Sequence, residues 1–361
     1  MKSSQAKTKC PSSVGQASGK LILMGEHSVV YGQPAIALPF AGVGVTATVS
    51  PSNHPLSVAC DFYRGVAYAM PEVLRSLKHA IHLSLQTIEE LGLNTSFVHQ
   101  RTRQVFINNE LTLADASFSK SPHLHIEIDS TIPAERGMGS SAAVAVAVTR
   151  GLFNYFGQEL SEQNLWRIVQ EAETIAHGNP SGIDTATTSG TRPIYYIKDQ
   201  VMDTMEMNMD AVLVVADSGK TGHTLEAVQA VKTLLDQEKL KGKSLLIEES
   251  IHDLGRLTNQ AKEALENNLP NRLGDLMNQA HERLQNLTIS NNQLDSLVAR
   301  ARQAGALGAK LTGGGRGGCM IALAANMDQA TTIAQELSLA GARQTWHHPF
   351  TLHPLKEVDH D

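Results

Sequence analysis

Apolar residues in the first sixty positions come in short runs that Gly, Pro and Gln interrupt. Short apolar runs between turn-forming residues are typical of strands. The pattern therefore predicts strands at KLILM (20–24), AIALPF (35–40) and GVGVTATV (42–49). A later run, HLHIEI (123–128), alternates polar and apolar residues, so its two histidines and its glutamate are expected on one strand face.

Helical spacing appears between and after these strands. Apolar residues that recur three and four positions apart predict an amphipathic helix. These residues are Val73, Leu74, Leu77, Ile81, Leu85 and Ile88. Two more helices are expected, from about 140 to 156 and from about 162 to 177. Ser161 has the residue type of an N-cap, and Gly178 that of the residue that follows a helix.

The second half of the chain mixes both kinds of element. Strands are expected at IYYI (194–197), AVLVV (211–215), Cys319–Ala324 and 343–351, and helices after about residue 220 and near 328–340. Strands and helices that alternate without a regular βαβ repeat indicate an α+β fold in two lobes. We expect a loose N-terminal tail over residues 1–16, an N-terminal domain over 17–200 and a C-terminal domain over 201–361.

Composition and charge narrow the class of protein. The 361 residues are 42% hydrophobic and 18% charged, with a formal net charge of −6, which gives no basic footprint for nucleic acid. Three scattered cysteines (Cys10, Cys60 and Cys319) are too few for a disulfide framework or a zinc site, which favours a reducing cytoplasm. The N-terminus lacks the apolar segment of a signal peptide, and no apolar run approaches the roughly 18 residues of a membrane span. We therefore expect a cytoplasmic protein that binds neither nucleic acid nor membrane.

The strongest chemical signal is PAERGMGSSAAVAVAV, which begins at Pro133. Gly137 and Gly139 allow close backbone approach, Ser140 and Ser141 carry hydroxyls, and an Ala/Val helix follows at once. Free N–H groups and the positive end of a helix dipole make such a segment an anion site. The alternative is an ordinary Ser-capped helix after a turn. No Lys-Ser/Thr pair follows the glycines, which excludes a Walker A loop.

A second glycine-rich segment is KLTGGGRGGCMIAL (310–323). Gly313, Gly315 and Gly318 satisfy the spacing G-x-G-x-x-G, but an apolar, strand-like run follows where a dinucleotide site needs a helix. The segment favours a loop that approaches a bound ligand, with a plain turn as the alternative.

The third segment is EAETIAHGNPSGIDTATTSG (171–190). Glu173 lies at the edge of an apolar helix stripe, one turn before His177, and Asp184 follows a tight NPSG turn. Two carboxylates on either side of a rigid turn can serve one pocket, one on a metal and one near a nucleophile. Alternatively, Asp184 is a simple N-cap or turn residue.

Together with GKLILMGEH (19–27), these segments resemble the three motifs of the GHMP kinases over residues 17 to 324. The order matches, with Gly-Lys-strand-Gly-Glu-His first, Pro-x3-Gly-x-Gly-Ser-Ser-Ala in the middle and Lys-Leu-Thr-Gly-x-Gly near the end. GKLILMGEHSVVYGQPAIA is similar to the first motif of the mevalonate kinases in particular, and HGNPSGID to their catalytic segment. The chain is identified as a bacterial-type member. The resemblance implies a two-lobed α+β fold, with a ribosomal S5 domain 2-like N-terminal lobe that holds ATP and Mg²⁺ and a ferredoxin-like C-terminal lobe.

The chain departs from the family pattern in three places. ASGK (17–20) stands where the family has Ala-Pro-Gly-Lys, Glu135 and Arg136 replace small residues, and Arg316 interrupts the last glycine run. Arg136 and Arg316 either alter nucleotide contacts or face solvent.

The resemblance also implies roles for individual residues. The implied nucleotide-binding residues are Pro133, Arg136, Gly137, Met138, Gly139, Ser140, Ser141 and Ala142. The implied acceptor-binding residues are Lys20, Glu26, His27, Ser181, Asp184, Thr312, Gly313 and Gly314. Mg²⁺ would be held by Glu173 with Ser140 or Ser141. Asp184 and Lys20 would be catalytic, with Asp184 either a true base or an electrostatic partner only.

The implied reaction is transfer of the ATP γ-phosphoryl group to the 5-hydroxyl of (R)-mevalonate, in the mevalonate route to isoprenoids. One alternative is another GHMP kinase that acts on phosphomevalonate or a sugar, although a phosphorylated acceptor should demand more basic residues than Lys20 in the first motif. A non-catalytic ligand sensor is a further alternative. Some family members are dimers, so a homodimer is possible.

Overall fold

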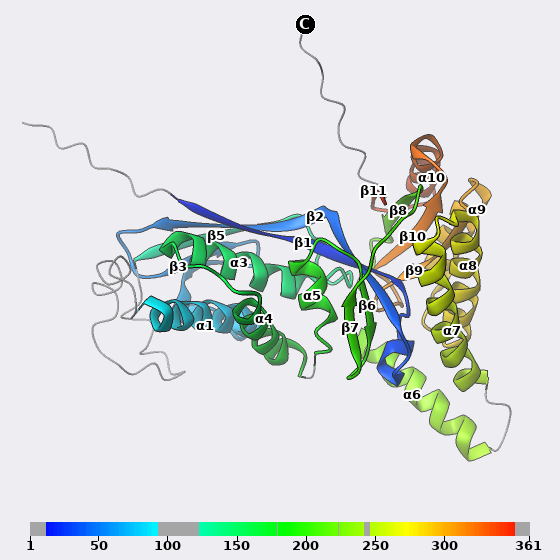
Figure 1. Ribbon diagram of the computed structural model, residues 1–361, viewed down its shortest axis with the longest axis horizontal. Coiled ribbons are helices and arrows are strands. Elements are labelled where there is room, and N and C mark those ends of the chain that lie inside the picture. The colour runs from blue at the N-terminus through cyan, green and yellow to red at the C-terminus, as the bar shows by residue number, and fades with distance from the viewer. Residues whose placement is uncertain (1–11, 93–122, 179, 223, 242–245, 351–361) are drawn as a thin grey trace, which may run out of the picture. The chain divides into compact units, whose positions relative to one another are not determined.

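The computed structural model describes residues 12–92, 123–178, 180–222, 224–241 and 246–350 (Figure 1). The chain divides into two compact units. The first contains Met1–Gly19, Val43–Ile132 and Gly139–Ser189, and the second contains Lys20–Gly42, Pro133–Met138 and Gly190–Asp361. Strands β1 (Ser13–Met24) and β2 (Ala35–Pro51) each begin in one unit and end in the other. The domain boundaries expected at residues 17 and 201 stay predictions.

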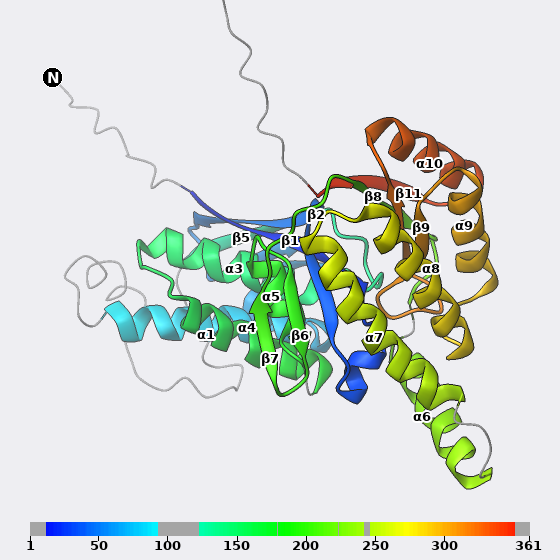
Figure 2. The same ribbon diagram turned by 45° about the vertical axis from the view of Figure 1, so that its right-hand side comes forward.

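The first unit builds a sheet and covers it with helices. Its strands lie in the order β4 (Tyr63–Val66), β3 (Ser57–Cys60), β5 (Leu124–Ser130) and the C-terminal part of β2. The pair β3–β5 is parallel and the other two pairs are antiparallel. Helices α1 (Arg75–Gly92), α3 (Ser140–Phe156) and α4 (Glu162–His177) lie on one side of this sheet (Figures 1 and 2), and the short α5 (Ile183–Ser189) packs on α3 and α4.

The predicted helices of this unit are confirmed, and their ends follow from local chemistry. The Ser161 hydroxyl accepts the Asn164 N–H at 3.2 Å and caps α4, as its residue type indicates. Gly178 follows α4 with a φ of +81°, a conformation that glycine adopts without steric cost. A short 3-10 turn (Glu72–Leu74) precedes α1, so the α-helix starts later than the apolar spacing suggests.

Two strand predictions need correction. Residues 13–16 are not part of a loose tail but the first residues of β1. A Cβ on Gly15 would lie 2.1 Å from the Ala147 carbonyl oxygen, so the bare glycine backbone packs directly on α3. The runs 35–40 and 42–49 form one strand, β2, since Gly42 keeps a negative φ and does not break it.

The second unit contains an antiparallel sheet of β8 (Val212–Asp217), β9 (Gly308–Thr312), β10 (Cys319–Ala324) and β11 (Gln344–Pro349). Their spatial order is β11-β8-β10-β9, the arrangement of a ferredoxin-like lobe, which confirms the expected fold. Helices α8 (Pro270–Asn286), α9 (Asn292–Gln303) and α10 (Met327–Leu339) pack against this sheet.

The second unit also holds the rest of its helices and a smaller set of strands. The N-terminal part of β2 pairs with β6 (Ile194–Ile197), and β6 pairs with β7 (Val201–Thr204). Helix α7 (Leu246–Glu266) lies beside α8, with α6 (Thr224–Lys241) before it in the chain (Figure 2). Across the described ranges, no helix has both the length and the apolar character to cross a membrane.

Candidate active site

Three motif segments meet in the second unit: the first is GKLILMGEH (19–27), the second is 133–138 and the third is the glycine run 310–318. The Lys20 N–H donates to the Met138 carbonyl at 2.9 Å, which joins the first segment to the second. The Thr312 hydroxyl donates to the Ile22 carbonyl at 2.7 Å, which joins the third segment to the first. A Cβ on Gly137 would lie 3.3 Å from the Gly314 nitrogen, so the second and third segments also touch. The structure thus brings together segments that are far apart in the sequence.

Strand β1 ends at a sharp turn that only glycine fits. Gly25 has a φ of +93°, and a Cβ there would lie 2.4 Å from the Pro34 carbonyl oxygen. The turn delivers Glu26 and His27 into the interior, where their exposed fractions are 3% and 6%. His27 itself has a φ of +59°, which is uncommon and costly outside glycine. Two unusual backbone conformations, at Gly25 and His27, are therefore needed to bury the side chains of Glu26 and His27.

Glu26 forms a buried ion pair with Lys310, a residue that the sequence analysis does not single out. The Lys310 Nζ donates to Glu26 Oε1 and, at 2.7 Å, to the Leu311 carbonyl. Burial raises the pKa of Glu26 and lowers the pKa of Lys310, while the attraction between the two opposes both shifts. A lysine inside the buried strand β9 was the one signal that could have found it, since lysine is almost never buried without a partner.

His27 is held as a neutral imidazole. Burial lowers its pKa to about 4, the hydrogen bond to Gly314 opposes that shift, and the charge of Arg316 adds to it. Its Nε2 lies 2.9 Å from the Gly314 carbonyl oxygen, which only accepts, so we assign the hydrogen to Nε2. Nδ1 is then an acceptor, and among the described residues neither it nor Glu26 Oε2 has a hydrogen-bond partner. Two adjacent residues therefore offer buried acceptor atoms.

Arg136 does not face solvent, so that alternative is wrong for this residue. Its Nε donates to Asp217 Oδ1 at 2.7 Å, and its Nη2 and Nη1 donate to the carbonyls of Gly219 and Ala134 at 3.1 and 3.2 Å. Asp217, at the end of β8, is another functional candidate that the sequence analysis misses. Arg316 is half-buried, and its backbone N–H donates to the Ile289 carbonyl at 2.7 Å.

The loop before α3 is built from glycines in left-handed conformations. Gly137 and Gly139 have φ angles of +72° and +75°. Gly139 is the N-cap of α3 and no side chain caps the helix, so the Ser-capped alternative is wrong. Ser140 and Ser141 are the first helical residues and are half-buried. The first-turn N–H groups of α3 are therefore left to bind an anion.

The last glycine run is the connection of a β-hairpin. Strands β9 and β10 pair antiparallel, with Thr312 opposite Cys319, and the glycines lie between them. Strand β10 follows the glycines directly, where a dinucleotide site needs a helix, as the sequence indicates. Gly313, Gly315 and Gly318 all have positive φ angles, and Gly314 is the residue whose carbonyl binds His27.

The two candidate carboxylates belong to the first unit. Glu173, on α4, is 2% exposed, and its Oε2 lies 3.7 Å from His177 Nε2. Asp184 lies inside the first turn of α5, not at its N-cap, and is half-buried. Ser181 is exposed, and its hydroxyl accepts the Ile183 N–H at 3.4 Å.

Gln170 fixes the segment between the two carboxylates. Its Nε2 donates to the Pro180 carbonyl at 3.0 Å, and its Oε1 accepts from the Thr185 hydroxyl at 3.1 Å. One amide thus ties α4 to the residues on both sides of Ser181 and Asp184. The sequence gives no local sign of this role, because a half-buried glutamine on a helix is ordinary.

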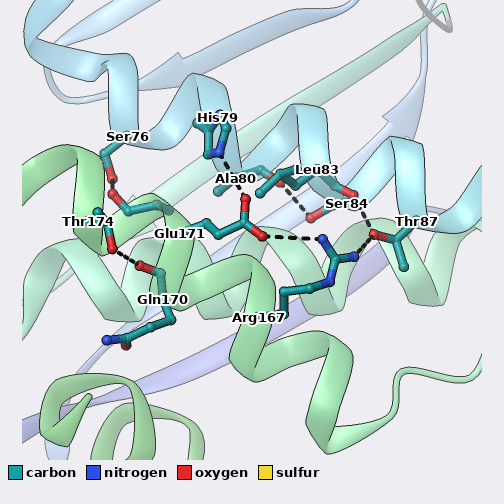
Figure 3. A network of polar contacts seen from close by, with 11 residues as sticks. Ser76, His79, Ala80, Leu83, Ser84, Thr87, Arg167, Gln170, Glu171 and Thr174 are labelled. Atoms are coloured by element: carbon teal, nitrogen blue, oxygen red, sulfur yellow. Dashed lines mark hydrogen bonds and ion pairs between the residues drawn. The ribbon is translucent and has the colours of Figure 1, made fainter. Parts of the chain in front are cut away.

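Helix α4 is in turn fixed to α1 by the polar network that Figure 3 shows. Arg167 donates to the Thr87 hydroxyl at 2.7 Å, and Glu171 lies 3.6 Å from His79. The Ser76 hydroxyl donates to the Ala172 carbonyl at 2.9 Å. The network therefore supports the helix that carries Glu173.

Within the described residues, no group of three or more His, Cys, Asp or Glu side chains could hold a metal ion.

Comparison with known proteins agrees with this arrangement. The chain matches the GHMP kinases N terminal domain over residues 106–191 and the GHMP kinases C terminal domain over residues 261–343. A curated mevalonate kinase of Pyrococcus horikoshii is 32% identical over 334 residues, which cover 91% of this chain and 92% of the relative.

Solved structures give the same result. Mevalonate kinase from methicillin-resistant Staphylococcus aureus MRSA252 is 27% identical, with a TM-score of 0.65 over 95% of this chain and 99% of that chain. L. major mevalonate kinase, solved in complex with R-mevalonate, is 25% identical, with a TM-score of 0.71 over 96% and 98%. The chain therefore belongs to the GHMP kinases, and within them to the mevalonate kinase family. Because relatives from Pyrococcus and Staphylococcus both match, the bacterial type stays a prediction.

Proposed function

We propose that this chain transfers the γ-phosphoryl group of ATP to the 5-hydroxyl of (R)-mevalonate and releases ADP and 5-phosphomevalonate. The observation that carries the proposal is the 32% identity with a mevalonate kinase over 91% of the chain. The buried acceptor atoms of Glu26 and His27 support it, because a hydroxylated acceptor can donate to them. The L. major relative was solved with R-mevalonate, which adds weight to this choice of acceptor.

ATP is the phosphoryl donor in this family, and we propose that the loop before α3 binds its phosphates. Gly137 and Gly139 have no side chains to obstruct a ligand, and Ala142 follows in the first turn of the helix. Backbone N–H groups there can donate to phosphate oxygens, assisted by the helix dipole. Met138 is buried and its carbonyl binds the Lys20 N–H, so its contribution is through the backbone.

We propose that Mg²⁺ is held by Glu173 together with the hydroxyl of Ser140 or Ser141. The donor set fits, since Mg²⁺ commonly takes one or two carboxylates and completes its shell with phosphate oxygens and water. A three-carboxylate cluster is accordingly not required. When bound, Mg²⁺ neutralises charge on the β- and γ-phosphates during transfer.

Asp184 and Lys20 are the proposed catalytic residues. Asp184 accepts the proton of the 5-hydroxyl, or stabilises that proton, while the hydroxyl oxygen bonds to the γ-phosphorus and the bond to ADP breaks. Lys20 stabilises the negative charge that develops on the attacking oxygen and on the transferred group. Thr312, Gly313 and Ser181 are proposed to complete the acceptor side, with Gly314 fixing His27.

The direct test is ADP release with Mg-ATP and, separately, (R)-mevalonate, phosphomevalonate, galactose or homoserine. Of the four acceptors, we expect only (R)-mevalonate to support ADP release. Turnover only with one of the other acceptors would overturn the proposal. Asp184→Asn should lower kcat by roughly 10²–10⁴-fold, the usual contribution of general acid–base catalysis.

We also propose a cytoplasmic location, because the few scattered cysteines suit a reducing compartment. Of these, Cys60 and Cys319 are free thiols in the structure, and Cys10 lies outside the described residues. A homodimer stays a prediction from the family resemblance, and light scattering after gel filtration would test it.

A further inference from the structure

The ion pair between Lys310 and Glu26 is the most deeply buried pair of charges in the described ranges. The exposed fractions of the two side chains are 0% and 1%. Lys310 comes from the middle of β9, where its backbone pairs with Ile321, and Glu26 comes from the turn after β1. The two residues are 284 positions apart in the sequence. The pair therefore joins the first and third motifs side chain to side chain.

Stability alone is a poor reason for this pair. Removing two charges from water costs several kcal/mol per ion, and apolar replacements of buried pairs are often neutral or stabilising. The pair is also incomplete as a structural contact, because Glu26 Oε2 has no hydrogen-bond partner among the described residues. A carboxylate held by one oxygen leaves the other available to a ligand.

We propose that Lys310 is a positioning residue for the acceptor alcohol: it binds Oε1 of Glu26 and fixes the carboxylate, so that Oε2 accepts a hydrogen bond from an acceptor hydroxyl. The inference rests on the proposed function, since it assigns Glu26 to the acceptor. His27 Nδ1 is a second acceptor atom on the next residue. Two such atoms suit the hydroxyl groups of the substrate and would repel its carboxylate.

The charges around the pair set the expected response to pH. Burial raises the pKa of the Glu26 carboxyl, Lys310 opposes that rise most strongly, and a backbone hydrogen bond of Glu26 and the charge of Lys20 oppose it more weakly. Beyond Lys310 lie His281, on α8, and its neighbours Asp295 and Arg302, on α9. Without Lys310 the pKa of Glu26 rises further, because burial is then opposed only by the backbone hydrogen bond of Glu26 and by Lys20. Glu26 is then protonated more readily than in the unmodified protein, and its proton is lost again as the pH rises.

The test is the Lys310→Met variant, which removes the charge and keeps the length of the side chain. We expect its KM for mevalonate to rise about tenfold or more at pH 7, the loss of a hydrogen bond to a charged group, with KM for ATP changed less than about twofold. The mevalonate KM of the variant should fall as pH rises from 6 to 9, whereas that of the unmodified protein should vary less. A role in folding alone would not produce this pH dependence.

Two further variants keep the test decisive. Glu26→Gln should raise the mevalonate KM without the pH dependence, and the double variant Lys310→Met/Glu26→Gln should behave like Glu26→Gln, since both act through one group. The double variant also removes both buried charges, so it can be assayed if Lys310→Met fails to fold. Lys262→Met, at an exposed pair with Glu266, is the matched control and should change neither KM.

The outcomes separate this inference from the proposed function. A mevalonate KM of Lys310→Met within about twofold of the original, or an equal rise in KM for ATP, would overturn the positioning role. If the unmodified protein uses another alcohol instead, the proposed function fails and the same variants are assayed with that alcohol. A pH-independent KM in every variant would then reject the inference as well.

Discussion

Arg136 and Asp217 form an ion pair with 2.7 Å between Nε and Oδ1, and their side chains are only 6% and 2% exposed. The same Asp217 oxygen accepts the Gly219 N–H at 2.8 Å, so the carboxylate holds both the guanidinium and its own turn. Arg136 directly precedes Gly137, where the proposed phosphate loop begins. The pair therefore fixes the entry to that loop against the end of β8.

Asp217→Ala should destabilise the protein strongly. The guanidinium of Arg136 would stay buried without its carboxylate, which costs about 3–5 kcal/mol. Chemical denaturation measures the free energy of unfolding. Glu336→Ala is the matched control, because its ion pair with Arg300 is partly exposed and should contribute no more than about 1 kcal/mol. Equal losses in the two variants would contradict a special role for the buried pair.

Gln170→Glu should lower kcat through the position of the segment that carries Asp184. The variant can still accept from the Thr185 hydroxyl, but it places a carboxylate against the Pro180 carbonyl in place of a hydrogen bond. We expect a decrease in kcat of about tenfold, since a small displacement of a catalytic group is costly. Steady-state kinetics measures it.

The control for that variant is Thr185→Val, which removes the other hydrogen bond of Gln170 and keeps the side-chain shape. It should lower kcat less, because the Pro180 bond remains. An unchanged kcat in Gln170→Glu, with unfolding also unchanged, would show that the amide does not position the segment.

Much of the fold follows from the sequence where one local pattern decides the element. Strands β8 and β10 are apolar throughout and buried at every position, and both were predicted. Helix α4 was predicted together with its Ser161 cap. Strand β9 was not predicted, because Lys310 interrupts its apolar run. Helix α5 was missed as well, since IDTATTS is rich in β-branched threonine and follows a turn.

In the candidate site, too, some residues could be predicted from the local sequence and others could not. Glycine positions such as Gly25 and Gly137 could be predicted, because positive φ angles and close approach require a residue without a side chain. The partners of Glu26 and Arg136 could not, since Lys310 and Asp217 lie 284 and 81 positions away. Such pairs depend on tertiary packing, which no local pattern records. The catalytic and binding roles of the site residues stay predictions.

Gly25→Ala should be much more harmful than Gly32→Ala. Both glycines have positive φ, +93° and +78°, which costs an alanine about 1–2 kcal/mol. A Cβ at Gly25 would also lie 2.4 Å from the Pro34 carbonyl oxygen, whereas one at Gly32 would meet nothing within 4 Å. We expect Gly25→Ala to lose further free energy of unfolding, with weaker mevalonate binding. Similar losses for the two variants would mean that the turn relaxes around the new side chain.

His27 should make the protein less stable in mild acid. Burial lowers its pKa to about 4 from a usual value near 6.5, so the unfolded chain binds the proton more readily than the folded one. The free energy of unfolding should therefore be fully retained above pH 6.5 and fall between pH 6.5 and 4. Each pKa unit corresponds to about 1.4 kcal/mol, so His27 contributes up to about 3 kcal/mol to the fall.

Urea denaturation between pH 4 and 7 measures this dependence. His281 contributes a similar fall, because its pKa is also lowered to about 4 by burial. His27→Gln should therefore flatten the profile in part, and His281→Gln should flatten it to a similar degree. Only His27→Gln is expected to weaken mevalonate binding at pH 7, since it alone removes Nδ1 of His27, the atom proposed to accept from the substrate. A His27→Gln profile as steep as that of the unmodified protein would contradict a buried, neutral imidazole at this position.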